Sequence, residues 1–160
     1  MQEIQFKEKQ YLGLNKMSLF RRITLSVFCF IAYYWSENLD KSGDLFFFLG
    51  ITILVISTLL VFILHFETKI INHSIILDGL WTARKVKINI NSIQSTEIVQ
   101  YSRFFFNRSV YNLHYKGSIR FFTRGKDAVK LTDNDGQVYL IGSQKVEELE
   151  RVIKKMLNNK

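Results

Sequence analysis

Histidine and cysteine are the side chains most often used to bind transition metals, and this chain of 160 residues holds few of them. His65, His73 and His114 are far apart in the sequence and show no zinc-ligand spacing. The single cysteine, Cys29, excludes an internal disulfide, and it lies within an apolar stretch. We interpret it as a buried thiol without chemistry. The sequence therefore predicts no metal site.

Carboxylates and glycine-rich loops serve acid–base catalysis and phosphate binding, but their pattern in this sequence indicates neither kind of site. Five acidic residues near the C-terminus fall in an expected turn or on one face of an expected helix, where solvated charge is the usual explanation: Asp133, Asp135, Glu147, Glu148 and Glu150. No phosphate-cradling glycine pattern is present. We predict no catalytic residue, no cofactor and no small-molecule substrate. An enzyme acting at the membrane stays as a third alternative, because a serine, a histidine such as His114 and an acid can meet in a fold.

The most suggestive region is 101–126, which mixes basic residues with eight Phe and Tyr. One interpretation is a surface that contacts anionic lipid; the other is a barrel whose aromatic residues form the core and whose basic residues are solvated. Nucleic acid is a less favoured ligand, because the chain is expected to be tethered to a membrane. The candidate contact residues are Arg84, Lys85, Lys87, Arg103, Arg108, Lys116, Arg120, Arg124 and Lys126.

Two apolar segments precede this region. Residues 45–66 run for 22 positions without a formal charge, and as a helix they would extend about 33 Å, enough to cross a hydrocarbon core of roughly 30 Å. A buried core helix is the alternative. Residues 20–39 form a shorter segment between Arg21-Arg22 and Glu37, which we expect to be a second span or a re-entrant or interfacial helix.

The distribution of charge predicts the orientation of these spans. Residues beyond 66 carry 16 Lys and Arg against nine Asp and Glu, and the first 22 residues are also basic. The short link between the segments is acidic. The positive-inside rule then places both termini in the cytoplasm of a multi-pass protein of the cell inner membrane.

After residue 66 the pattern changes to the alternation typical of strands. Val86, Ile88 and Ile90 share one face, and Asp78-Gly79 is expected to be the turn of a hairpin between 74–77 and 80–83. Further strands are predicted over 93–101, 110–115, 118–123, 128–132 and 137–141, with the last two paired across residues 134–136. The apolar spacing from residue 146 to 157 predicts a closing amphipathic helix.

The whole arrangement resembles the bacterial pleckstrin-homology-like membrane proteins, in which two N-terminal spans precede a PH-like domain. The residues that carry the resemblance are the double span, 77–80 at the first hairpin, 128–131, and 139–143 before the final helix. The resemblance implies an α+β chain: a transmembrane helical hairpin, then an antiparallel β-barrel of about seven strands capped by a C-terminal helix. Because the Asp78-Gly79 turn is acidic and tight, inositol-lipid specificity is not expected.

These observations predict a membrane region over residues 1–66 and a cytoplasmic PH-like domain over 67–160. Since no catalytic constellation is visible, we expect a non-enzymatic module that binds a protein partner or its own copies near the bilayer. The alternative is a domain that binds or senses anionic lipid.

Overall fold

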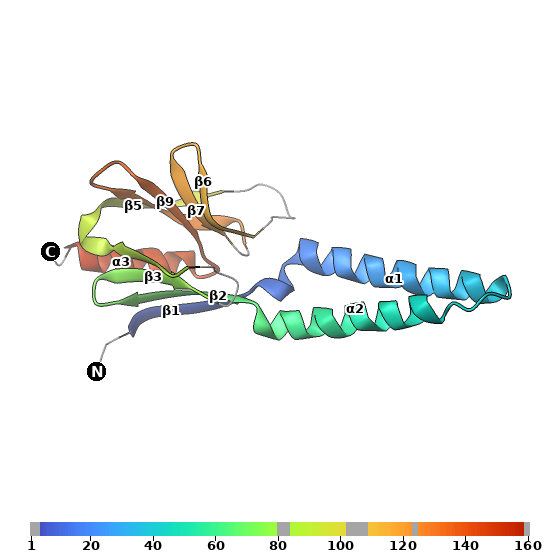
Figure 1. Cartoon of the computed structure of the whole chain (residues 1–160). Coiled ribbons are helices and arrows are strands. Elements are labelled where there is room, and N and C mark those ends of the chain that lie inside the picture. Colours follow the sequence, from blue (N-terminus) through green and yellow to red (C-terminus); the bar gives the residue numbers. More distant parts are fainter. Residues whose placement is uncertain (1–3, 80–83, 102–108, 123–124, 159–160) are drawn as a thin grey trace.

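The computed structural model describes residues 4–79, 84–101, 109–122 and 125–158. The elements in chain order are β1 (Ile4–Tyr11), the 3-10 helix η1 (Leu12–Leu14), α1 (Lys16–Asn38), α2 (Asp44–Ile63), β2 (His65–Ile71), β3 (Ser74–Asp78), β4 (Val86–Asn89), the 3-10 helix η2 (Ile90–Ser92), β5 (Ile93–Gln100), β6 (Val110–Tyr115), β7 (Ser118–Phe122), β8 (Asp127–Asp133), β9 (Val138–Gly142) and α3 (Val146–Asn158). The fold is α+β, as predicted, with two long helices projecting from a β domain (Figure 1).

The N-terminal segment, expected to belong to the membrane region 1–66, instead forms the strand β1. β1 pairs antiparallel with β2, and Tyr11 lies opposite His65. Phe6, Glu8 and Gln10 are buried on one face. The alternation was not visible in the sequence because two of these three buried residues are polar. The helical pair is therefore inserted between the first two strands of a sheet, so the β domain extends beyond residues 67–160.

α1 and α2 form an antiparallel helical hairpin that packs through small side chains. The buried residues of the two helices are Ser26, Cys29, Gly50 and Ser57. The Ser26 hydroxyl donates a hydrogen bond to the Gly50 carbonyl at 3.1 Å. Small residues let helix backbones approach closely, which is how helices associate in lipid.

Only one helix in the described part of the chain, α2, is long and apolar enough to cross a membrane. Its mean hydropathy reaches 2.8 over 18 residues, and only 11% of that stretch is buried, unlike the core helix of a soluble protein. α1 does not meet the same standard, because its uncharged stretch between Arg22 and Glu37 is short. Composition therefore supports one span of the expected pair.

The described strands form two sheets instead of the expected antiparallel barrel of about seven strands. The first sheet has the order β1-β2-β3-β4, and the second has the order β5-β8-β9-β7-β6 with β7 and β9 parallel. No backbone pairing between described strands joins the two sheets. The 3-10 helix η2 turns the chain between β4 and β5, and apolar side chains from both sheets form one core.

The first hairpin turn lies at a different position from the predicted one. β2 and β3 are joined by Asn72 and His73, whose φ values of 48° and 56° fit a two-residue turn with both residues left-handed. Asp78, predicted as a turn residue, ends β3, and residues 80–83 of the expected second strand lie outside the described residues. The alternating strand β4 is confirmed, with Ile88 buried.

The closing helix is confirmed and packs on the core through Leu149, Ile153 and Met156. β1 fastens the start of this helix. The Glu8 carboxylate accepts hydrogen bonds from the Ser143 hydroxyl at 2.5 Å and from the Gln144 N–H at 2.9 Å. A buried carboxylate is favourable here because the N-terminus of a helix carries partial positive charge.

Candidate functional site

The basic residues that the sequence singled out do not all lie on one face. Six of the nine are described, whereas Arg103, Arg108 and Arg124 lie outside the described residues. We call the part of the β domain from which α1 and α2 emerge the hairpin end (Figure 1).

Arg84 and Lys85 lie at the hairpin end. They immediately precede β4, whose first residue, Val86, pairs with Leu77 near the end of β3. That end of β3 pairs with the start of β2, which only Leu64 separates from α2. Both cations are exposed, so they extend from the same edge of the first sheet as the helices.

Lys126 belongs to the same end of the second sheet. Its carbonyl accepts a hydrogen bond from the Tyr101 N–H at 2.9 Å, and it directly precedes β8. The next residues of β8 pair with the end of β9, where Ala128 lies opposite Gly142. The Gly142 carbonyl in turn accepts a hydrogen bond from Gln10, close to where β1 leads into α1. Three of the six described candidates therefore lie near the helices.

The other candidates lie elsewhere. Lys116 is at the tip of the β6–β7 hairpin, at the end of the second sheet remote from the helices (Figure 1). The Arg120 guanidinium lies 4.5 Å from the centre of the Tyr115 ring, and Lys116 lies 5.5 Å from the same ring. Lys87 is exposed in the middle of β4. Lys116, Arg120 and Tyr115 therefore form a separate cation–aromatic cluster, and Lys87 lies apart from it on β4.

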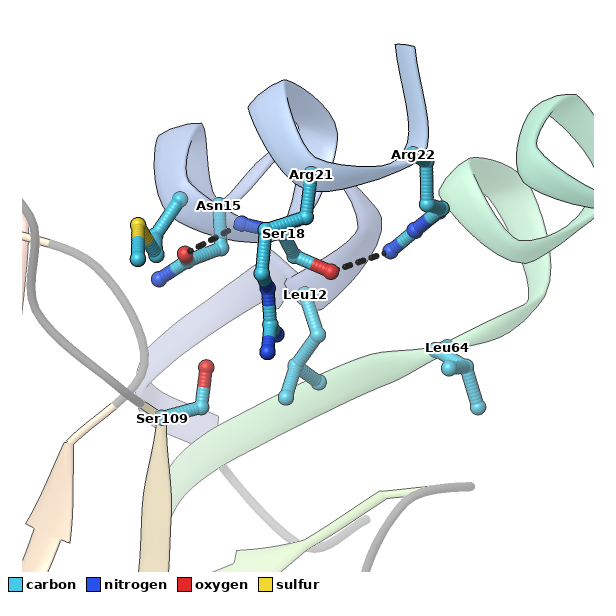
Figure 2. A pocket seen from close by; sticks show the side chains of 8 residues that line it. Leu12, Asn15, Ser18, Arg21, Arg22, Leu64 and Ser109 are labelled. Atoms are coloured by element: carbon cyan, nitrogen blue, oxygen red, sulfur yellow. Dashed lines mark hydrogen bonds between the residues drawn. The ribbon is translucent and has the colours of Figure 1, made fainter. Parts of the chain in front are cut away.

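A pocket of about 210 Å³ lies at the junction between the helical hairpin and the β domain (Figure 2). It combines two arginines and small polar groups with an apolar wall. The lining residues are Leu12, Asn15, Met17, Ser18, Arg21, Arg22, Leu64 and Ser109. They come from η1, the first turns of α1, the α2–β2 link and the residue before β6, so four chain segments meet here.

Arg22 is held by contacts within the protein. One guanidinium nitrogen donates to the Ser57 carbonyl on α2 at 3.3 Å, and another donates to the Ser18 hydroxyl at 2.6 Å. Ser18 is itself positioned by the helix start, since its N–H donates to the Asn15 side chain at 3.3 Å. This network links α1 to α2 and fixes one positive charge at the edge of the pocket.

Arg21 has a different environment. Its side chain extends from α1 past Leu12 toward Ser109 (Figure 2). The ion pairs between described residues all use lysine, so no carboxylate in the described part of the chain neutralises Arg21 or Arg22. The pocket is thus a positively charged cavity without an internal counterion among these residues.

The apolar wall of the pocket is held tightly. The Leu12 N–H donates to the Leu64 carbonyl at 2.9 Å, which joins η1 to the end of α2. A Cβ atom on Gly13 would lie 2.3 Å from the Val61 Cα, so this position excludes any side chain. The two chain segments that connect the helices to the sheet are therefore in direct backbone contact.

The other titratable groups offer no catalytic arrangement among the described residues. No three His, Cys, Asp or Glu side chains approach closely enough to hold a metal ion in the described part of the chain. His114 is exposed on β6, and His73 lies in a turn. Burial, aided by the negative charge of Asp127, raises the pKa of Tyr101 to about 12, so this hydroxyl stays protonated and donates to the Gly125 carbonyl.

Sequence reasoning placed Arg21 and Arg22 at the border of a span but did not assign them to a site. The adjacent pair of arginines at the start of an apolar helix was the available signal. What the sequence did not reveal was the approach of Ser109, which lies more than 80 residues away and lines the pocket.

No known family model matches the chain, and a search of curated proteins found no significant match.

Proposed function

We propose that this protein is a multi-pass protein of the inner membrane in which the helical hairpin enters the bilayer and the cytoplasmic β domain is a non-enzymatic, PH-like binding module. The module contacts the anionic lipid surface through its hairpin end. Both termini are cytoplasmic, because the basic residues are concentrated on that side of the spans.

One observation carries this proposal: cations that have no carboxylate partner among the described residues gather where the helices leave the β domain. Arg84, Lys85 and Lys126 are exposed there, and Arg21 and Arg22 lie on the first turns of α1. Only one residue separates α2 from β2, so this end is held close to the proposed bilayer surface, whose charge acts over roughly 8 Å at physiological salt. Each Lys or Arg near an anionic membrane contributes about 1 kcal/mol of attraction.

The two sheets and the covering helix α3 are consistent with an open variant of the PH-like arrangement. In such a variant the sheets are bridged by α3 and by side-chain packing instead of continuous strand pairing. The family resemblance remains a proposal about ancestry, and the activity is argued from the charges at the hairpin end.

A protein-binding role is the second candidate, and the β6 edge favours it. Among the described strands, β6 pairs only with β7, and Leu113 and Tyr115 on it are 44% and 49% exposed. An edge of this kind can accept a strand from another chain, either a partner or a second copy of this one. Crosslinking in native membranes that recovers only monomer would exclude it.

The test compares the full chain in nanodiscs of neutral phosphatidylcholine with the full chain in nanodiscs that also contain phosphatidylglycerol. We expect amide hydrogen exchange over residues 84–86 and 125–128 to slow in anionic nanodiscs and to recover as salt is raised. The β6–β7 tip should exchange equally in both and serves as an internal reference.

Two triple variants with the same loss of charge separate position from net charge. Arg84→Gln, Lys85→Gln and Lys126→Gln together should remove the effect of anionic lipid. The matched control, Lys116→Gln, Arg151→Gln and Lys155→Gln, changes exposed cations away from the hairpin end and should retain it. Equal exchange of the unsubstituted chain in the two lipids would exclude contact between the β domain and anionic lipid.

A further inference from the structure

The two arginines of the junction pocket differ in the partners of their guanidinium groups. The Arg22 guanidinium donates hydrogen bonds to the Ser57 carbonyl and to the Ser18 hydroxyl, both within the protein. Arg21 extends into the pocket and has no carboxylate partner among the described residues. Arg21 is exposed, so its guanidinium is accessible to an anion from outside the protein, and its planar fork of N–H donors matches the oxygens of a phosphate.

The pocket has the dimensions and chemistry of a site for a compact anionic group. Its volume of about 210 Å³ is below the roughly 300 Å³ at which sites for larger small molecules begin. Polar groups from Asn15 and Ser18 lie on one side, and Leu12 and Leu64 form an apolar wall. This combination suits a phosphate that is attached to a hydrocarbon-bearing molecule.

The surroundings of Arg21 favour a lipid over a free ion. Phe20 and Ile23 flank the arginine pair on α1 and are 60% and 48% exposed, so apolar side chains face outward beside the pocket. A phospholipid places its phosphate at the depth of the arginines and its acyl chains along such a surface.

We propose that the junction pocket binds the phosphodiester of one anionic phospholipid, with Arg21 as the direct ligand and Arg22 as a fixed neighbouring charge. This inference rests on the proposed function, because it requires the hairpin end to lie at the bilayer surface. It goes further in assigning a saturable site of defined stoichiometry, in contrast to the diffuse attraction of Arg84, Lys85 and Lys126.

Native mass spectrometry of the full chain tests it, after delipidation in detergent and addition of phosphatidylglycerol. We expect one tightly retained phosphatidylglycerol per chain, and Arg21→Gln should weaken its retention at least about tenfold. Lys41→Gln in the link between the helices removes the same charge and should change nothing. Arg21→Lys should bind with intermediate affinity, because it keeps the charge but loses the planar fork.

Competition distinguishes the two sources of phosphate. Inorganic phosphate or glycerophosphate at millimolar concentration should not displace the lipid; if either does so, the pocket is a site for soluble phosphate and the lipid assignment is overturned. Thermal unfolding in detergent confirms that each variant is folded, and if Arg21→Gln is not, Arg21→Lys alone decides, with undiminished retention overturning the proposal.

Failure of this inference is distinguishable from failure of the proposed function. Unchanged lipid retention in Arg21→Gln, together with loss of the anionic-lipid effect on exchange in the hairpin-end triple variant, would overturn the pocket site and leave the surface contact standing. Equal exchange in neutral and anionic nanodiscs would overturn the surface contact, whatever Arg21→Gln does.

Discussion

The helical hairpin and the β domain bury opposite kinds of side chain. In the hairpin the buried residues are small, such as Ser26 and Gly50, while Phe48 and Phe62 are 65% and 72% exposed. In the β domain many of the fully buried residues are large, such as Phe121. Water drives large apolar side chains inward, whereas lipid leaves them outside and selects small residues at helix contacts. This difference is the one expected if the hairpin lies in lipid, as proposed, and the β domain in water.

The difference also explains where cations remain without partners. Within the β domain, Glu67 on β2 pairs with Lys69 on the same strand and with Lys7 on the neighbouring strand β1. At the border between the two regions, Arg21 has no such partner among the described residues. If the proposed membrane placement holds, anionic headgroups at this border would supply the counterion that the described carboxylates do not.

The largest effect we expect is in the labelling of the two ends of the molecule from outside the membrane. If it is absent, the contrast between a hairpin in lipid and a β domain in water is wrong. Single cysteines are introduced as Ser42→Cys in the link between the helices and as Lys116→Cys at the β6–β7 tip, each in a Cys29→Ser background. In right-side-out vesicles a membrane-impermeant maleimide should label only Ser42→Cys, because the proposed orientation places the tip of the hairpin outside. Labelling of both sites before permeabilisation, or of Lys116→Cys alone, contradicts the proposed orientation.

The second prediction tests the two solvents with the same substitution. Phe121→Ala opens a cavity in the β domain and should lower the free energy of unfolding by about 3–5 kcal/mol. Phe62→Ala removes a side chain that faces outward and should lower it by much less in detergent micelles. Urea titration of both variants, with the fluorescence of the full chain as signal, measures the difference. A loss in Phe62→Ala as large as that in Phe121→Ala would show that the hairpin buries its aromatic residues in protein.

The third prediction concerns the joint. Gly13→Ala places a methyl group against the Val61 backbone, which cannot move aside like a flexible side chain. We expect an overpacking loss of about 1–3 kcal/mol and weaker retention of lipid in the pocket, because η1 forms its wall. Leu14→Ala, at the neighbouring exposed position, is the control and should have little effect. A Gly13→Ala chain with wild-type stability would mean that the joint is loose.

Much of the fold was predictable because local periodicity reports local burial. Alternation identified β4, and the helical spacing of Leu149 and Ile153 identified α3 with its buried face. β8 and β9 were found with their pairing, because the turn between them contains Gly136 in a left-handed conformation.

What could not be predicted depended on contacts between distant segments. The buried Glu8 carboxylate accepts hydrogen bonds from Ser143 and Gln144, and nothing in the sequence around Glu8 indicates these partners, which lie 135 and 136 residues away. The separation into two sheets was likewise not predictable, because it depends on which strands pair, and local alternation does not specify the partner of a strand. The pocket needed both the Arg21 position and the approach of Ser109, and only the first was visible in the sequence.

The smallest effect we expect comes from Glu67, which joins the two strands that carry the helices. Its carboxylate lies 2.7 Å from the Lys69 ammonium and 3.4 Å from that of Lys7. Burial acts to raise the pKa of Glu67, but the hydrogen bonds and charges of Lys69 and Lys7 outweigh it, and the net pKa falls below the ordinary 4.5. A carboxylate with a lowered folded pKa contributes stability that is fully present above its unfolded pKa and is lost as the pH falls through the folded value.

Glu67→Gln should therefore lower stability at neutral pH by less than about 1 kcal/mol, as for other partly exposed pairs, and the difference from wild type should vanish well below pH 4.5. Thermal unfolding of both chains from pH 7 to pH 3 measures this, with Glu97→Gln as the control for an exposed pair on the second sheet. A gap that persists at low pH would assign the contribution of Glu67 to packing and not to charge.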